Sequence, residues 1–137
     1  MDIVMARTFS QWLGDYSNAM GLDDVGDFAR DRTLVVHDII CTFVHPCGDQ
    51  HDIAAVLLDA GLPSTVSEHD LVGLALSRNL ANFLLGAPLF FVNPASQHLV
   101  LGQKFEFAQI DPPSFAPLLD ALALQAKAWR DRRSAAR

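Results

Sequence analysis

Four side chains that could bind a metal or act as nucleophiles lie close together in the chain: Cys41, His45, Cys47 and His51. On an extended strand, positions 41, 45 and 47 share one side because side chains alternate. Zinc accepts two cysteines with two histidines. However, these spacings match no familiar zinc pattern, and Cys41 lies in an apolar run, where a buried thiol is ordinary. We therefore expect packed or surface side chains here, and no metal site.

Covalent catalysis finds no better support in the sequence. A cysteine nucleophile needs a thiolate activated at a helix N-terminus or beside a cation, and neither cysteine is predicted there. Ser67, His69 and Asp70 are residue types of a hydrolase triad, but they are neighbours on one predicted helix, whereas a triad converges from separate elements. Ser67 is better explained as a helix cap, with Asp70 at the N3 position. Without a glycine-rich nucleotide motif either, we expect no enzyme and no cofactor.

The composition predicts a single domain over residues 1–137, with flexible ends at about 1–7 and 131–137. Half of the 137 residues are apolar and 19% are charged. This apolar content is slightly more than a small monomer needs to cover itself. It suggests a subunit interface or an exposed apolar patch.

The net charge argues against one class of partner, and the distribution of apolar residues indicates the compartment. A net charge of −6 and a pI near 5.1 argue against a nucleic-acid partner, which would require a basic surface. The segment Met1–Leu13 lacks the apolar stretch of a signal peptide, and no run approaches the ~20 apolar residues of a membrane span. We expect a cytoplasmic protein with reduced thiols.

The periodicity of apolar residues predicts eight elements. Three stretches repeat at helical spacing: Thr8 or Ser10 to about Met20, Ser67–Leu85 and Pro113–Trp129. Four apolar or β-branched runs predict strands: a hairpin over Leu34–Val44 that turns at His37-Asp38, Ile53–Leu58, Leu89–Val92 and Leu99–Phe107. The Ile53–Leu58 run fits either period, and its shortness favours a strand. The expected fold is α+β, in the order α-β-β-β-α-β-β-α, with an antiparallel twisted sheet flanked by helices.

Two adjacent aromatic residues indicate that both faces of this sheet need cover. Phe90 and Phe91 lie side by side in a predicted strand, so their rings point to opposite faces. One face can pack against the domain's own helices. The other is expected to need a partner.

The order of these elements resembles the class I chaperones of bacterial type III secretion, the group typified by the Tir chaperone. The resemblance runs from about Phe9 to Trp129. It includes the opening amphipathic helix, the hairpin Leu34–Val44 and the strand that ends at Gly61-Leu62-Pro63. It continues with the helix leading to Leu84, the second hairpin and the closing helix. The connection from His45 to His51 departs from this pattern.

This resemblance implies a homodimer that binds the N-terminal chaperone-binding segment of a secreted effector and performs no hydrolysis. Such a chaperone keeps the segment extended, using apolar patches and strand addition to a sheet edge, and presents it to the secretion ATPase. Carried over to this chain, the effector-binding residues are Trp12, Leu13, Tyr16, Ile39, Cys41 and Phe43. The dimer-interface residues are Leu76, Leu80, Phe83, Leu84, Phe91 and Leu101.

Two alternatives remain open at this point. One is a small-ligand-binding or enzymatic α+β domain whose apolar residues line a closed pocket. The other is a subunit adaptor unrelated to secretion.

Overall fold

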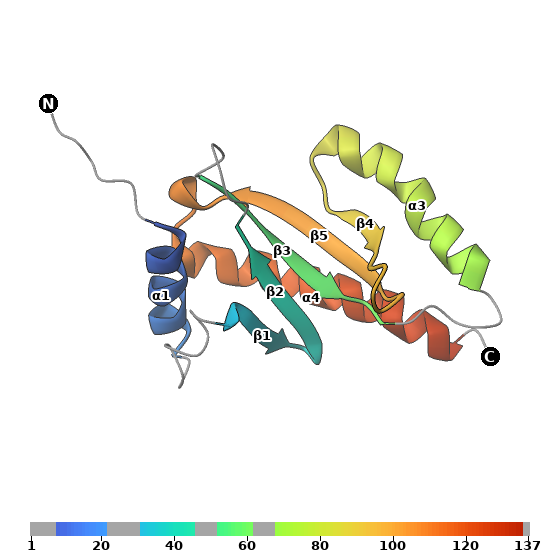
Figure 1. Ribbon diagram of the computed structural model, residues 1–137, viewed down its shortest axis with the longest axis horizontal. Coiled ribbons are helices and arrows are strands. Elements are labelled where there is room, and N and C mark those ends of the chain that lie inside the picture. Colours follow the sequence, from blue (N-terminus) through green and yellow to red (C-terminus); the bar gives the residue numbers. More distant parts are fainter. Residues whose placement is uncertain (1–7, 22–30, 46–51, 62–67, 136–137) are drawn as a thin grey trace, which may run out of the picture.

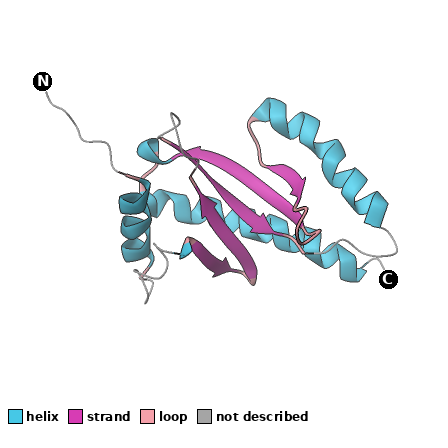
Figure 2. Ribbon diagram, in the orientation of Figure 1, coloured by secondary structure: helices cyan, strands magenta, loops and turns pink. Residues whose placement is uncertain are grey.

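The computed structural model describes residues 8–21, 31–45, 52–61 and 68–135, and the described side chains exclude 68–72 and 132–135 (Figure 1). The helices and strands follow one another in the predicted order α-β-β-β-α-β-β-α (Figure 2). Their bounds are α1 Phe9–Met20, β1 Thr33–Val36, β2 Ile39–Val44, β3 Ile53–Asp59, α3 Glu68–Leu85, β4 Leu89–Val92, β5 Leu99–Glu106 and α4 Pro112–Ala135, with a short 3-10 helix η1 at Phe107–Gln109. The ambiguous third apolar run is a strand, as predicted. The closing helix continues past the predicted end at Trp129 to Ala135.

The five strands form one antiparallel sheet in the order β1-β2-β3-β5-β4. The β1–β2 hairpin turns at the predicted dipeptide, where His37 and Asp38 both take a positive φ, of 51° and 65°. Such a pair matches the twist of a two-residue hairpin. Figure 1 shows α4 behind the sheet, α1 at one end of it, and α3 beyond β4.

Among the described helices, α1 and α4 cover one face of the sheet, and the other face has no such cover. Alternate strand residues pack under α1 and α4, and they include Ile39, Phe43, Val56, Leu101 and Phe105. An aromatic cluster joins α1, the sheet and α4: Trp12, Tyr16, Phe43, Phe105 and Phe115. The indole Nε1 of Trp12 donates to the carbonyl oxygen of Ile110 at 2.8 Å, which ties α1 to the segment before α4.

The third helix, α3, is attached to the edge of the sheet by polar contacts. The Asn79 amide accepts from the backbone N–H of Phe90 at 2.8 Å and donates to its carbonyl oxygen at 2.9 Å. Asn82 donates to the carbonyl oxygen of Pro88, and the Arg78 guanidinium lies 5.2 Å above the Trp129 ring. Asn79 thus occupies the backbone groups with which β4 would pair a further strand.

We expect Asn79→Ala to lower the free energy of unfolding by about 1–3 kcal/mol, because it leaves both Phe90 backbone groups without their side-chain partner. Urea unfolding followed by circular dichroism measures the loss. Ser77→Ala is the matched control on the same helix, since the Ser77 hydroxyl donates only to the nearby Leu74 carbonyl. Equal stability of the two variants would contradict the anchoring role of Asn79.

Candidate functional site

The six residues predicted to bind an effector form one cluster, but the cluster lies inside the protomer. Trp12, Leu13, Tyr16, Ile39, Cys41 and Phe43 are each between 0% and 3% exposed. They belong to the core between α1, β2 and α4 and present almost no surface to a partner of the protomer. The sequence identified them because the strongest apolar periodicity marks the buried face of an element. A role for them in effector binding stays a prediction.

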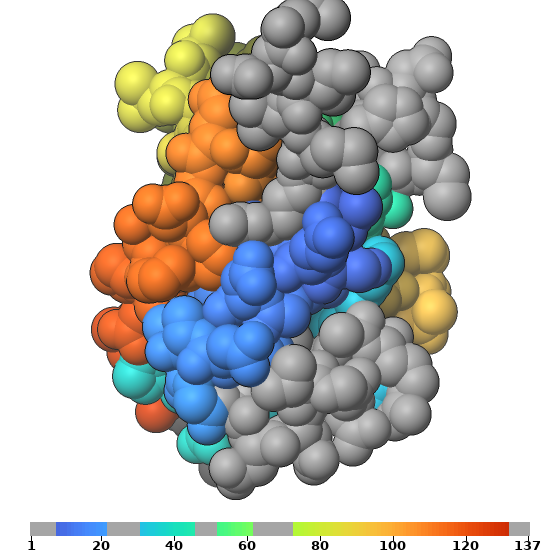
Figure 3. Space-filling view, turned by 90° about the vertical axis from the view of Figure 1, so that its left-hand side faces the viewer, coloured from blue at the N-terminus to red at the C-terminus, as the bar shows by residue number. Residues whose placement is uncertain are grey.

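Above part of this cluster the surface is hollowed. The hollow has a volume of about 240 Å³ and is lined by Tyr16 and Met20 of α1, Leu34 and Val36 of β1, and Ala116, Leu119 and Asp120 of α4. Figure 3 shows this end of the molecule, with α1 in blue across it. We call this hollow the β1 groove. Of the residues that line this groove, the sequence analysis named only Tyr16 as effector-binding. The α4 residues were not named, because their spacing indicated only a helix that packs on the core.

The β1 groove lies beside the open edge of the sheet. In the described part of the chain, β1 pairs only with β2 and ends the strand order. The opposite edge, at β4, is occupied by Asn79. One edge therefore remains for an added strand.

Two titratable groups beneath the groove are held in their neutral forms. Burial raises the pKa of Tyr16 to about 12, and the negative charges of Cys41 and Asp120 add to the effect. Burial also raises the pKa of the Cys41 thiol to about 11, partly offset by a backbone hydrogen bond. A protonated, buried thiol is a poor nucleophile and a poor metal ligand.

The cysteine–histidine stretch is only partly described. Cys41 donates to the carbonyl oxygen of Ile39, and the His45 ring packs on Phe9 and Phe107 at centroid distances of 5.2 and 5.5 Å. Cys47, His51 and Ser67 lie outside the described residues. Within the described ranges, no three potential metal ligands come together. No helix in these ranges has the length and apolarity to cross a membrane.

Five of the six predicted dimer-interface residues are exposed. Leu76, Leu80, Phe83 and Leu84 form a row along α3, between 48% and 75% exposed, and Phe91 of β4 is 49% exposed. Leu101 is fully buried beneath the helices and presents no surface on the protomer, so its place in an interface stays a prediction. We call these five exposed residues the α3 row. Leu85, 81% exposed, was not identified, although it directly follows Leu84.

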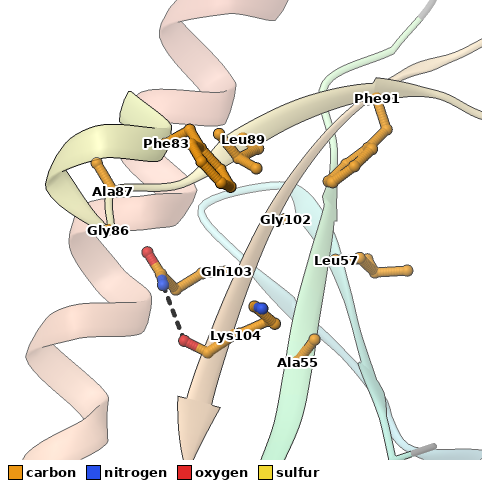
Figure 4. Close-up of a pocket in the computed structure, with 10 residues that line it drawn as sticks. All are labelled: Ala55, Leu57, Phe83, Gly86, Ala87, Leu89, Phe91, Gly102, Gln103 and Lys104. Atoms are coloured by element: carbon orange, nitrogen blue, oxygen red, sulfur yellow. Dashed lines mark hydrogen bonds between the residues drawn. The ribbon is translucent and has the colours of Figure 1, made fainter. Parts of the chain in front are cut away.

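A second hollow, of about 430 Å³, separates the end of α3 from the uncovered face of the sheet. In Figure 4, Phe83 and Leu89 lie at one end of it and Phe91 and Leu57 at the other, with Gly102 between them. Gly102 leaves room for the Phe91 ring, because a Cβ atom there would lie 2.8 Å from the ring and would displace it. The remaining lining residues are Ala55, Gly86, Ala87, Gln103 and Lys104.

Comparison with solved structures finds several chains with the same fold, and two of them are described here. A chain of the HopA1–SchA chaperone–effector complex is 13% identical, with a TM-score of 0.60 over 90% of this chain and 93% of that chain. A chain of the ExsC–ExsE complex is 14% identical, with a TM-score of 0.68 over 95% of each chain. No family model matches the chain, and no curated protein sequence matches it significantly. At these identities the likeness establishes the fold, which confirms the predicted α+β architecture.

We expect the Cys41 thiol to resist alkylation at pH 8 in the folded protein, because it is buried and its pKa is about 11. Iodoacetamide labelling of the Cys47→Ser variant, followed by mass spectrometry, isolates this thiol. The same variant in denaturing urea is the control and should label fully. Rapid labelling of the folded variant would instead indicate an accessible, activated cysteine.

Proposed function

We propose that this protein is a non-catalytic chaperone that holds an extended segment of a secreted effector. One juxtaposition supports the proposal most strongly: an apolar groove opens beside the sheet edge that nothing in the described part of the chain occupies. The fold is also that of a chain from a chaperone–effector complex. Together with the sequence resemblance, these features favour type III secretion as the setting, the cytoplasm as the compartment and the secretion ATPase as a later partner.

The backbone of β1 is oriented for strand addition. Val36 pairs with Ile39 and Leu34 with Cys41, while Phe43 donates to the carbonyl oxygen of Arg32 at 2.7 Å. In an antiparallel hairpin the hydrogen-bonded residues alternate with residues whose N–H and C=O point the other way. The backbone groups of Thr33 and Val35 therefore point away from β2, toward the place of an added strand.

The groove offers an apolar binding site for side chains of such a strand. Leu34 and Val36 lie on the helix-facing side of β1 and line the groove. Alternate side chains of an added strand fall on this same side, next to Met20 and Ala116. Backbone pairing supplies affinity for any extended segment, and the apolar seat supplies selectivity for segments with an apolar side chain in register.

We further propose that the protein acts as a homodimer joined through the α3 row. Burying each of these large side chains would contribute about 1.5–3 kcal/mol. The hollow beside Phe83 and Phe91 continues the same apolar surface onto the sheet. A second copy can cover the α3 row symmetrically, as most homodimers do.

A small-ligand-binding protein is the second candidate. The hollow at the end of α3 has a volume of about 430 Å³, and ligand sites range over roughly 300–1,000 Å³. Its lining offers few polar groups, with Lys104 as the charged one. Native mass spectrometry of the purified protein separates the candidates, since a bound small molecule adds its mass and a dimer doubles it.

The chaperone proposal is tested by purifying the tagged chain from its native host and identifying the protein that it retains. We expect one effector, held through its N-terminal segment. Val35→Pro should reduce its recovery at least about tenfold, because proline removes an outward-pointing N–H without breaking a β1–β2 hydrogen bond.

Val35→Thr is the matched control for this variant, as it keeps the N–H and the β-branched shape. Equal recovery by the proline and threonine variants, with unchanged melting temperatures, would show that the effector does not pair with β1.

Leu80→Asp is expected to convert the dimer to a monomer, because it would bury an unpaired carboxylate at the subunit contact. Light scattering coupled to size exclusion measures the mass. Leu124→Asp is the control, since Leu124 is an exposed leucine of α4, 49% accessible and outside the α3 row. A monomeric wild type, or a dimer that survives Leu80→Asp, would remove the α3 row from the interface.

A further inference from the structure

We propose that Asp120 selects client segments that carry a basic side chain two positions from the apolar side chain seated in the β1 groove. This inference rests on the proposed chaperone function and deepens it. It names a sequence feature of the client, an apolar residue and a lysine or arginine separated by one residue.

Asp120 is electrostatically isolated on its own helix. Between Pro112 and Ala126 it is the one ionisable residue of α4, and among the described residues it is the one charged side chain that lines the β1 groove. Its side chain is 54% exposed. Among the described residues, no lysine or arginine forms an ion pair with it. An apolar groove with a single carboxylate at its rim is complementary to an apolar segment with a single cation.

The carboxylate is positioned by the β1–β2 turn. His37 contacts Asp120 through its Nε2 atom, and the turn is fixed a second time by Arg130, which donates to the carbonyl oxygen of Asp38 at 2.9 Å. The pair with His37 is exposed on both sides, so solvent weakens it. An ammonium, or a guanidinium that binds both carboxylate oxygens, is the stronger partner and can displace the imidazole.

Strand geometry places the selected residue. Val36 lines the groove and is followed at once by His37, so Asp120 lies near the turn end of β1. In an added strand, side chains on one face recur every second residue, about 6.5 Å apart. Suppose that one client side chain occupies the groove beside Leu34 and Val36. The client side chain two positions further toward the turn lies on the same face and reaches Asp120.

Among the described residues that line the groove, Asp120 carries the one charge. The lining residues from α1 and β1 carry no charge at neutral pH, because Tyr16 stays protonated. Asp38 and Arg130 do not line the groove, but they meet at the turn beside it, where the Arg130 guanidinium donates to the Asp38 carbonyl oxygen. Their side chains carry opposite charges, so the charge that a client meets within the groove is that of Asp120, in contact with His37.

The test is a selection from a phage-displayed library of random twelve-residue peptides, so that no client needs to be known. Against the wild-type protein we expect enrichment of a basic residue two positions from an aliphatic or aromatic residue. Asp120→Asn, which keeps the shape and removes the charge, should lose that enrichment. Asp131→Asn, at another exposed carboxylate of α4, is the control and should keep it.

A selected basic peptide and its version with glutamine at the basic position are then titrated by fluorescence anisotropy. The wild type should prefer the basic peptide about threefold to tenfold, with the preference falling as salt rises, and Asp120→Asn should bind the two alike. His37→Asn, which suits the left-handed turn, should tighten binding of the basic peptide by removing the competing imidazole.

The outcomes separate this inference from the function on which it rests. Peptides that need the groove, as shown by loss of binding in Ala116→Trp and Val35→Pro, but carry no basic preference would overturn the inference alone. A preference that survives in Asp120→Asn would do the same. If no selected peptide depends on the groove, both the inference and the proposed binding site fall. Melting temperatures confirm that each variant is folded.

Discussion

The arrangement of the protomer depends on one constraint: a five-stranded sheet has two faces, and the helices in the described part of the chain cover only one of them. α1 and α4 meet over the face formed by Ile39, Phe43 and Leu101, and their aromatic side chains close the core there. α3 is held at the β4 edge by Asn79 and adds little cover. The opposite face keeps Val35, Ile40 and Phe91 exposed. The surplus of apolar residues in the sequence is accounted for by this uncovered surface and by the α3 row.

The two edges of the described sheet differ in whether their outward backbone groups already have a partner, so only the β1 edge is suited to pairing with an added strand. Asn79 engages the outer backbone groups of β4 with a side chain, which blocks pairing there. At the other edge, β1 is short and presents the backbone of Thr33 and Val35 outward. A short edge strand normally limits unwanted association. Here it lies next to an apolar groove with a single carboxylate, an arrangement suited to the controlled addition of one segment.

The sequence was sufficient to predict the elements and their order. Alternation in the β1–β2 hairpin, the dipeptide His37-Asp38 and the stripe of Phe9, Leu13 and Tyr16 are local signals, and local signals define local structure. The opposite orientations of Phe90 and Phe91 were likewise predictable, since they follow from strand geometry alone. The Phe90 ring packs on the Trp129 ring with 4.7 Å between their centroids, while Phe91 remains exposed.

The surfaces were harder to predict, because apolarity alone does not distinguish a core residue from an interface residue. Leu80 and Leu101 have the same side chain, yet one is 72% exposed and the other is buried. They differ because α3 is attached through Asn79 and Arg78, and such tertiary contacts cannot be inferred from the spacing of apolar residues. Asp120 was missed for a similar reason: its contact with His37 joins residues that lie 83 positions apart in the sequence.

The central claim is that a client segment pairs with the outer edge of β1. Amide hydrogen exchange, compared between the chain alone and the complex purified from its native host, tests this most directly. The account predicts strong new protection at Thr33 and Val35, with the β4 amides little changed because Asn79 already engages that edge. Unchanged exchange at Thr33 and Val35 in a complex that holds its client would contradict it.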